Sequence, residues 1–186
     1  ETAHLDRLSI SLCDNVTERS NSDYMLSHLR ENNLFLIALD PTHTWCRYHH
    51  LFADLLRHRQ RQQLASDVIQ NLHERASDWH QTAGQISEAI EYALKGDVQQ
   101  KAVHLLEDNW HDIQHRGELG TMRRWLDTLP DNTVTSSAPL SMAYCWLHQL
   151  SGETDAVEAR LADVKHAWNQ HKSNNTVPDR EAWIVI

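Results

Sequence analysis

Three glycines, Gly84, Gly117 and Gly152, recur at spacings of 33 and 35 residues in a chain that has only five glycines. Glycine often ends a helix because it adopts the left-handed backbone conformation without strain. Apolar residues follow the three glycines at matching offsets, namely Ala89, Met122 and Val157 after five residues and Ala93, Leu126 and Leu161 after nine. This period is typical of stacked helix pairs such as tetratricopeptide (TPR) repeats. We therefore predict an α-solenoid in which each glycine occupies the same turn.

Apolar residues spaced by three or four predict helices throughout this part of the chain. A helix of five turns is predicted from Leu64 to Ala83, and a second one ends at Gly96. The third is predicted to begin behind Asp97, which is a suitable N-cap. Later helices are predicted around residues 119–129, 140–150 and 157–168. Five tryptophans lie on the apolar stripes and are predicted core residues: Trp79, Trp110, Trp125, Trp146 and Trp168.

The first third of the chain combines helix and strand patterns. Leu8, Leu12 and Val16 predict one helix, and a second is predicted to open at Ser22. Residues 34–39 and 44–48 flank the turn residues Asp40-Pro41-Thr42-His43 and predict a β-hairpin, after which helical spacing resumes from Leu51. The predicted fold class is therefore mainly α. A winged-helix-like domain of helices and one hairpin spans residues 1–62, and an incomplete TPR-like repeat region spans residues 63–186.

The charge distribution argues against a nucleic-acid-binding or membrane protein. The net charge is −9, and residues 1–62 hold 7 basic and 8 acidic residues, whereas residues 63–186 hold 10 and 18. Such acidity disfavours sequence-independent binding to nucleic acid or anionic lipid. The basic stretch 57–61 ends a predicted helix, where a solvated face or a protein contact is favoured over nucleic acid. The longest apolar run, residues 34–39, is far shorter than the roughly 20 residues of a membrane-spanning helix.

The ends and the cysteines indicate where such a chain works. It opens at Glu1 with no initiator methionine or signal core, so we expect a segment of a longer protein. The cysteines Cys13, Cys46 and Cys145 are odd in number and widely spaced, which does not indicate a disulfide framework. We expect a cytoplasmic protein. An array that ends without its next repeat exposes an apolar face, so self-association of the isolated chain is also expected.

No catalytic motif is present in the sequence. Phosphate-binding glycine loops, nucleophile elbows, His-Glu-x-x-His and paired-cysteine zinc motifs are all absent. The densest potential metal-ligating cluster is His43, Cys46, His49 and His50. Strand alternation puts Cys46 on one face and His49 on the other, so these side chains do not converge easily. We therefore expect neither an enzyme nor a metal site in this chain, and a metalloenzyme is the least favoured alternative.

Residues 45–56, Trp-Cys-Arg-Tyr-His-His-Leu-Phe-Ala-Asp-Leu-Leu, resemble the segment that follows the ATPase module in the MalT-like, large LuxR-type bacterial transcription activators. Residues 5–8, 12–17, 33–36 and 39–40 are similar to the winged-helix region of that family. Residues 72–79, 88–94, 117–119 and 125–130 are similar to its first superhelical repeats. The resemblance covers about residues 5–165. The resemblance is specific in the Arg-Tyr-His-His-Leu-Phe block and diffuse in the repeats. The sequence departs from the family at Cys46, where an aromatic residue is expected.

The resemblance implies a piece of a STAND-class signal-transduction ATPase. Family members combine an ATPase domain, a winged helix, a helical sensor and a DNA-binding helix-turn-helix, and inducer with ATP switches them from an ADP-held monomer to an active oligomer. The P-loop and the DNA-reading helices would lie outside this chain, so the chain itself would hold no cofactor and make no direct nucleic-acid contact. Its implied partners are the ATPase domain of the same protein and a small-molecule or protein inducer.

The resemblance also implies a role for one residue, His49. Tyr48-His49-His50-Leu51 is similar to the Met-His-Asp block of related eukaryotic switch ATPases, whose histidine touches the β-phosphate of ADP. By that match His49 is the ADP phosphate sensor, and a histidine N–H suits the role because it donates to phosphate. His50 departs from the aspartate of the block. A purely structural alternative is that His49 only closes the hairpin onto the next helix. For the whole chain, the alternative function is a stand-alone TPR-like protein-binding module.

Overall fold

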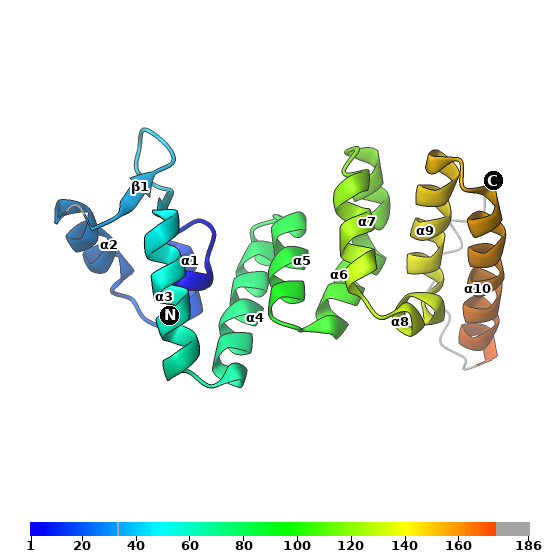
Figure 1. Cartoon of the computed structure of the whole chain (residues 1–186), viewed down its shortest axis with the longest axis horizontal. Coiled ribbons are helices and arrows are strands. Elements are labelled where there is room, and N and C mark those ends of the chain that lie inside the picture. The colour runs from blue at the N-terminus through cyan, green and yellow to red at the C-terminus, as the bar shows by residue number, and fades with distance from the viewer. Residues whose placement is uncertain (33, 174–186) are drawn as a thin grey trace. The chain divides into compact units, whose positions relative to one another are not determined.

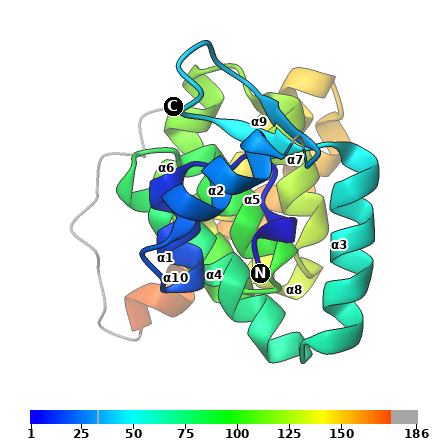
Figure 2. The same ribbon diagram turned by 90° about the vertical axis from the view of Figure 1, so that its left-hand side faces the viewer.

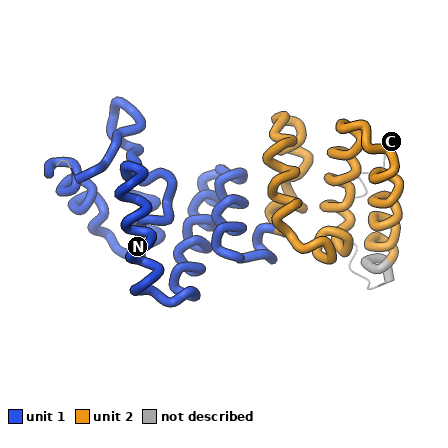
Figure 3. Tube along the Cα trace, in the orientation of Figure 1, with its two compact units in different colours: residues 1–102 blue, residues 103–186 orange. Residues whose placement is uncertain are grey.

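The computed structural model describes residues 1–32 and 34–173, and it is mainly helical with one small antiparallel sheet (Figure 1). The chain divides into two compact units, residues 1–102 and a second unit beginning at Val103 (Figure 3). The predicted fold class, a winged helix followed by helix pairs, is confirmed. Within the described residues, no helix combines the length and apolar character needed to cross a bilayer.

Unit 1 contains the winged helix and the first helix pair. Its elements are η1 (Thr2–His4), α1 (Ile10–Thr17), α2 (Ser22–Glu31), β1 (Leu36–Ala38), β2 (Cys46–Tyr48), α3 (His50–Gln63), α4 (Ser66–Thr82) and α5 (Ile86–Lys95). Helix α6 (Gln99–His115) begins in unit 1 and continues into unit 2, which further contains α7 (Leu119–Thr128), α8 (Asp131–Ser136), α9 (Ala138–Ser151) and α10 (Thr154–Ser173).

The predicted hairpin forms, but it is shorter than expected. β1 and β2 pair antiparallel, with Leu36 opposite Tyr48 and Ala38 opposite Cys46. Strand β1 does not include residue 35, because Phe35 has a φ of 57° and interrupts the extended backbone. Leu8, which the periodicity assigned to the first helix, instead forms a β-bridge to Cys46 through hydrogen bonds of 2.7 and 3.0 Å. Helix α1 therefore begins later than predicted, capped by the Ser9 hydroxyl.

The winged helix and the first helix pair share one hydrophobic core. Helix α1 packs on α4. Buried Leu8, Leu12 and Val16 lie in the same cluster as Leu72 and Tyr92. The Trp79 indole donates to the Ser11 hydroxyl at 2.9 Å, which adds a polar link between the two parts. The division proposed at residue 62 falls at the end of α3 and remains a prediction, whereas the compact unit extends to Ala102 because of this shared core.

All three repeated glycines occupy equivalent turns, as predicted. Gly84, Gly117 and Gly152 have φ values of 73°, 76° and 75° and connect α4 to α5, α6 to α7, and α9 to α10. In each turn the next N–H donates to the carbonyl five residues back, with N···O distances of 2.8, 3.2 and 3.0 Å. This is the hydrogen-bond pattern of a Schellman motif, which satisfies carbonyls at the helix end.

The expected N-cap at Asp97 is wrong. Asp97 has a φ of 55° and helps to close α5 instead, and the Val98 N–H donates to the Ala93 carbonyl. Gly96 has a φ of −85°, so it does not form a left-handed turn. Glycine is needed at this position because α5 lies very close to α4. A Cβ on Gly96 would lie 2.6 Å from the Cβ of His73 in α4.

The tryptophan prediction is confirmed in part. Trp110 and Trp125 are almost fully buried, and Trp79 and Trp146 are half-buried. Trp168 was expected in the core, but 39% of its surface is exposed. Leu161, at the same repeat position as buried Ala93 and Leu126, is also exposed. The apolar face of α10 is thus less covered than the corresponding faces of α5 and α7.

Candidate functional site

His49 lies at the junction between β2 and α3, where it is the residue preceding the first turn of the helix. Its backbone N–H donates to the Phe35 carbonyl at 2.7 Å, and its carbonyl accepts from the Ala53 N–H at 2.9 Å. The half-buried His49 ring lies 4.4 Å, centroid to centroid, from the ring of His50. The hairpin and the helix together therefore fix the backbone of the predicted sensor residue.

The start of α3 has the properties of an anion site. The first-turn amides of a helix have no partner within the helix, and the helix dipole places partial positive charge there. The His49 side chain makes no capping hydrogen bond to these amides, so it does not satisfy them itself. A phosphate placed at this end could accept from the amides and from the His49 ring together. Anion binding is therefore the chemistry that the described residues around His49 support.

Phe35 ties the hairpin to α3 and holds an unusual backbone conformation. A φ of 57° is uncommon for any residue other than glycine and costs about 1–2 kcal/mol. The carbonyl of this residue accepts the His49 N–H, and its ring stacks on Phe52 with the centroids 5.1 Å apart. Phe52 in turn meets the edge of Tyr48 at 5.7 Å. These contacts maintain the strained residue beside His49.

The histidine and cysteine cluster does not form a ligand set. Cys46 is buried with its thiol directed at the Leu8 carbonyl, 3.7 Å away, whereas His43 lies in the exposed hairpin turn with a φ of 55°. Within β2 the side chains alternate, because Cys46 faces the core and Arg47 is exposed, whereas His49 follows the strand as the residue before α3. Across residues 1–32 and 34–173, no group of three or more His, Cys, Asp or Glu side chains is arranged to hold a metal ion.

The basic stretch 57–61 divides between two faces of α3. Arg57 donates to the Ala3 carbonyl at 2.9 Å, and Gln60, which is buried, donates to the Glu1 carbonyl at 3.2 Å. Arg59 and Arg61 are exposed. The stretch is therefore partly structural, since two of its side chains fasten α3 to the first residues of the chain.

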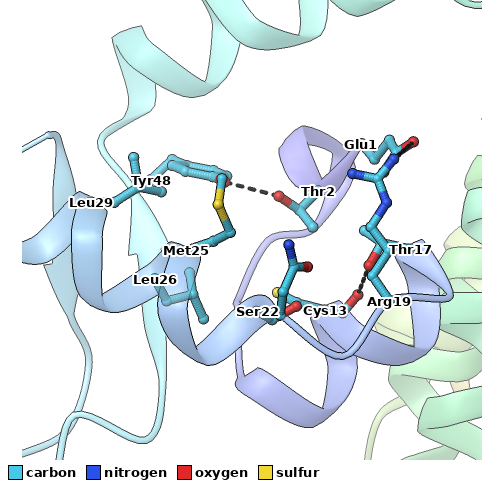
Figure 4. A pocket seen from close by; sticks show the side chains of 11 residues that line it. Glu1, Thr2, Cys13, Thr17, Arg19, Ser22, Met25, Leu26, Leu29 and Tyr48 are labelled. Carbon is cyan, nitrogen blue, oxygen red and sulfur yellow. Dashed lines mark hydrogen bonds and ion pairs between the residues drawn. The ribbon is translucent and has the colours of Figure 1, made fainter.

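A small cavity that the sequence did not predict lies between η1, α1, α2 and β2 (Figure 4). Its volume is about 170 Å³. The Thr2 and Tyr48 hydroxyls meet at 2.9 Å beside it, and Arg19 forms an ion pair with Glu1 at 3.2 Å. Burial raises the pKa of the Cys13 thiol in its wall to about 12. That thiol therefore stays protonated at neutral pH and is a poor nucleophile.

Three histidines, buried His73 and His80 and half-buried His4, lie between the winged helix and the first helix pair. The His4 and His73 rings meet edge to face at 4.9 Å, and the His80 ring stacks on Tyr92 at 5.1 Å. Burial is the main cause that lowers the pKa of each of the three histidines, and for His73 the pKa falls to about 4. These histidines are mainly neutral at pH 7, and His73 and His80 act as core residues, which no spacing in the sequence indicated.

Comparison with known proteins connects this geometry to a family. Residues 1–68 match the family model described as the MalT winged helix domain. Curated relatives include the serine/threonine-protein kinase PknK of Mycobacterium tuberculosis and of Mycobacterium bovis. Each is 31% identical over 131 residues, which is 70% of this chain and 12% of the relative. The chain thus matches only a small part of these longer proteins.

Proposed function

Residues 1–68 are a winged helix domain of the MalT-like regulator family, and from this premise we propose that the chain is the regulatory segment of an ATP-dependent, LuxR-type transcription activator. The winged helix docks on the ATPase domain of the same protein. The helix pairs relay binding of a small-molecule or protein inducer and so control oligomerisation. The observation that supports this proposal most is the position of His49, at a helix start suited to phosphate and inside the family match.

His49 is the proposed sensor of the ADP phosphate. With ADP on the ATPase domain, its ring N–H and the first-turn amides of α3 donate to phosphate oxygens and favour the resting state. The nucleotide supplies the negative charge, and this chain supplies donors on a backbone fixed by the hairpin. The chain itself is not an enzyme in this proposal. Its parent would be a slow switch ATPase in the cytoplasm whose P-loop lies in another domain.

The test is the substitution His49→Ala in the parent protein. Weaker binding of ADP to the resting state shifts the equilibrium toward the active state, so basal transcription without inducer should rise. His58→Ala is a matched control, because His58 is a histidine of α3, lies nine residues after His49 and is exposed. Unchanged basal transcription and ADP affinity in the His49→Ala protein would reject the sensor role.

One relative is named as a protein kinase, which bears on the kind of effector domain that the parent protein carries. The part of PknK that matches this chain is a small share of that protein. A similar segment can therefore serve parents with different effector domains, and the proposed regulation through His49 does not depend on which effector is attached. Reading the coding frame on both sides of this segment would show whether the parent ends in a DNA-binding helix-turn-helix.

A second candidate function is a TPR-like protein-binding module, which the three equivalent glycine turns favour. Stacked helix pairs often present an extended surface to a peptide or partner domain. Capture experiments with the parent protein, which would carry the nucleotide, distinguish the two functions. A partner that binds the parent equally well with or without nucleotide, and binds the His49→Ala parent equally well, would support the module.

A further inference from the structure

The cavity in the winged helix differs from the packed interior around it, because it has one apolar and one polar wall (Figure 4). Met25 and Leu29 lie one turn apart on α2 and form the apolar wall with Leu26. Thr2 and Arg19 lie on the opposite side (Figure 4). Figure 2 looks onto this part of unit 1, where α1, α2 and the first residues of the chain lie together. A space with such mixed walls is typical of a small-ligand site, whereas packed interiors hold few spaces larger than a water molecule.

The volume of the cavity limits the ligand to a small molecule. Cavities of about 150 Å³ in proteins take up molecules the size of benzene. A volume of about 170 Å³ therefore admits about six to eight non-hydrogen atoms. Exposed Met25 and Arg19 line the cavity, so a ligand reaches it from solvent. A nucleotide is much larger, and the cavity is thus distinct from the site proposed at His49.

Arg19 determines the charge of the ligand. It is the single basic side chain among the described residues that line the cavity, and its Nη2 lies 3.2 Å from Glu1 Oε1. Both side chains are exposed, at 60% and 36%. Ion pairs this exposed are weak, so a second carboxylate can replace Glu1 on the guanidinium. Arginine binds carboxylates through two parallel N–H groups, which suits this exchange.

Neutral polar groups in the cavity are available for the same ligand. The Thr2 and Tyr48 hydroxyls share one hydrogen bond of 2.9 Å. Since one of them donates to the other, the accepting hydroxyl keeps its own hydrogen for a ligand oxygen. Asn21 also lines the cavity, and its side chain precedes α2 without capping it. An anion held by Arg19 therefore has other donors in the same cavity, while the apolar wall suits a hydrocarbon tail.

We propose that this cavity is a binding site for a small organic carboxylate with a short hydrocarbon tail. Arg19 binds the carboxylate in exchange for Glu1, and the apolar wall encloses the tail. Enclosure of the tail is favourable because it removes apolar surface from water. Inorganic anions lack that contribution and should bind more weakly. The site goes beyond the function proposed above and does not depend on an ATPase domain.

The experiment is a titration of the ¹⁵N-labelled 186-residue chain, followed by NMR chemical shifts. The probe is 3-methylbutanoate, and its neutral analogue 3-methylbutanamide has almost the same shape. We expect saturable shift changes in residues that line the cavity, with a dissociation constant of about 1 mM for the carboxylate. The amide should bind about 10-fold more weakly, because it forms no charge-assisted hydrogen bond with Arg19. Inorganic phosphate tests the contribution of the tail and should also bind more weakly.

Two substitutions should change the affinity in opposite directions. Arg19→Gln removes the cation and should weaken 3-methylbutanoate binding about 10-fold, while binding of the amide stays unchanged. Glu1→Gln removes the competing carboxylate and should tighten 3-methylbutanoate binding about 2–5-fold. Arg30→Gln is the matched control, because Arg30 is an exposed arginine of α2 that does not line the cavity. Thermal unfolding of the three variants should be nearly unchanged, since each removes an exposed charge.

Four outcomes would overturn the proposal. Absence of saturable binding to the wild-type chain would show that the cavity is not a carboxylate site. Equal affinity for the amide, unchanged in Arg19→Gln, would indicate a neutral ligand instead. Equally tight binding of inorganic phosphate would indicate a general anion site in which the apolar wall has no role. Chemical-shift changes confined to residues outside the winged helix would place the binding elsewhere.

Discussion

Replacing Gly96 by alanine tests how closely α5 approaches α4. The φ of −85° suits alanine, so the backbone itself is not strained. The new Cβ, however, would lie 2.6 Å from the His73 Cβ and 3.3 Å from the Tyr92 carbonyl oxygen, whereas carbon atoms prefer about 3.5–4.0 Å. The His73 Cβ is fixed to the backbone of α4, so relief requires the two helices to separate. Overpacking of this kind costs about 1–3 kcal/mol.

Alanine also reduces the entropy of the unfolded chain, which offsets about 0.4–1 kcal/mol of that cost. We therefore expect a net loss of about 1–2 kcal/mol. With an m-value of about 2 kcal/mol/M, the urea midpoint of unit 1 should fall by about 0.5–1 M. Gly120→Ala is the matched control, because nothing lies within 4 Å of its added Cβ in α7, and it should be neutral or stabilising.

Urea unfolding followed by circular dichroism gives the midpoints, and hydrogen exchange of α4 and α5 assigns the change to unit 1. Exchange is needed because the chain has two compact units, and a single transition would not show which of them changed. A Gly96→Ala protein that is as stable as the wild type, or more stable, would refute the close approach of the two helices. The same decrease in Gly120→Ala would show that loss of glycine, not the contact with His73, is responsible.

Three other predictions concern stability. The pKa of His73 is about 4 in the folded protein and 6.5 in the unfolded chain, so the contribution of the neutral ring to stability is complete above pH 6.5 and is lost as the pH falls toward 4. The free energy of unfolding should therefore be about 1–2 kcal/mol lower at pH 5 than at pH 7, and His73→Gln should reduce this pH dependence. Gly117→Ala should cost about 1–2 kcal/mol, because alanine at a φ of 76° is strained, and Gly117→Asn should cost less in the same urea titration. Ser9→Ala should cost about 1 kcal/mol, measured by thermal melting, because it removes the acceptor for the Leu12 N–H at the start of α1.

Periodicity predicts the long helices well because each buries an apolar stripe, but it fails where a local conformation depends on a distant contact. Helix α8 was not predicted, since its six residues include two threonines and a valine, which are weak helix formers. Packing supports it, because Val134 is buried and its carbonyl accepts from the Ser141 hydroxyl at 2.9 Å. Asp97 was misassigned because it has a φ of 55°, whereas an N-cap residue has an extended backbone.

The position of His49 could be predicted from its motif, but the exposed surface beside it could not. Helix α3 offers two competing apolar stripes, Leu51 with Leu55 and Phe52 with Leu56, and helical spacing alone does not choose between them. Polar anchors decide the rotation of the helix, since the side chains of Arg57 and Gln60 bond to carbonyls more than 50 residues earlier in the chain. These bonds hold the Phe52 side of the helix against the protein and leave both leucines exposed next to His49. The exposure of Leu51 and Leu55 is thus a consequence of hydrogen bonds to the first residues of the chain, and no apolar pattern encodes those bonds.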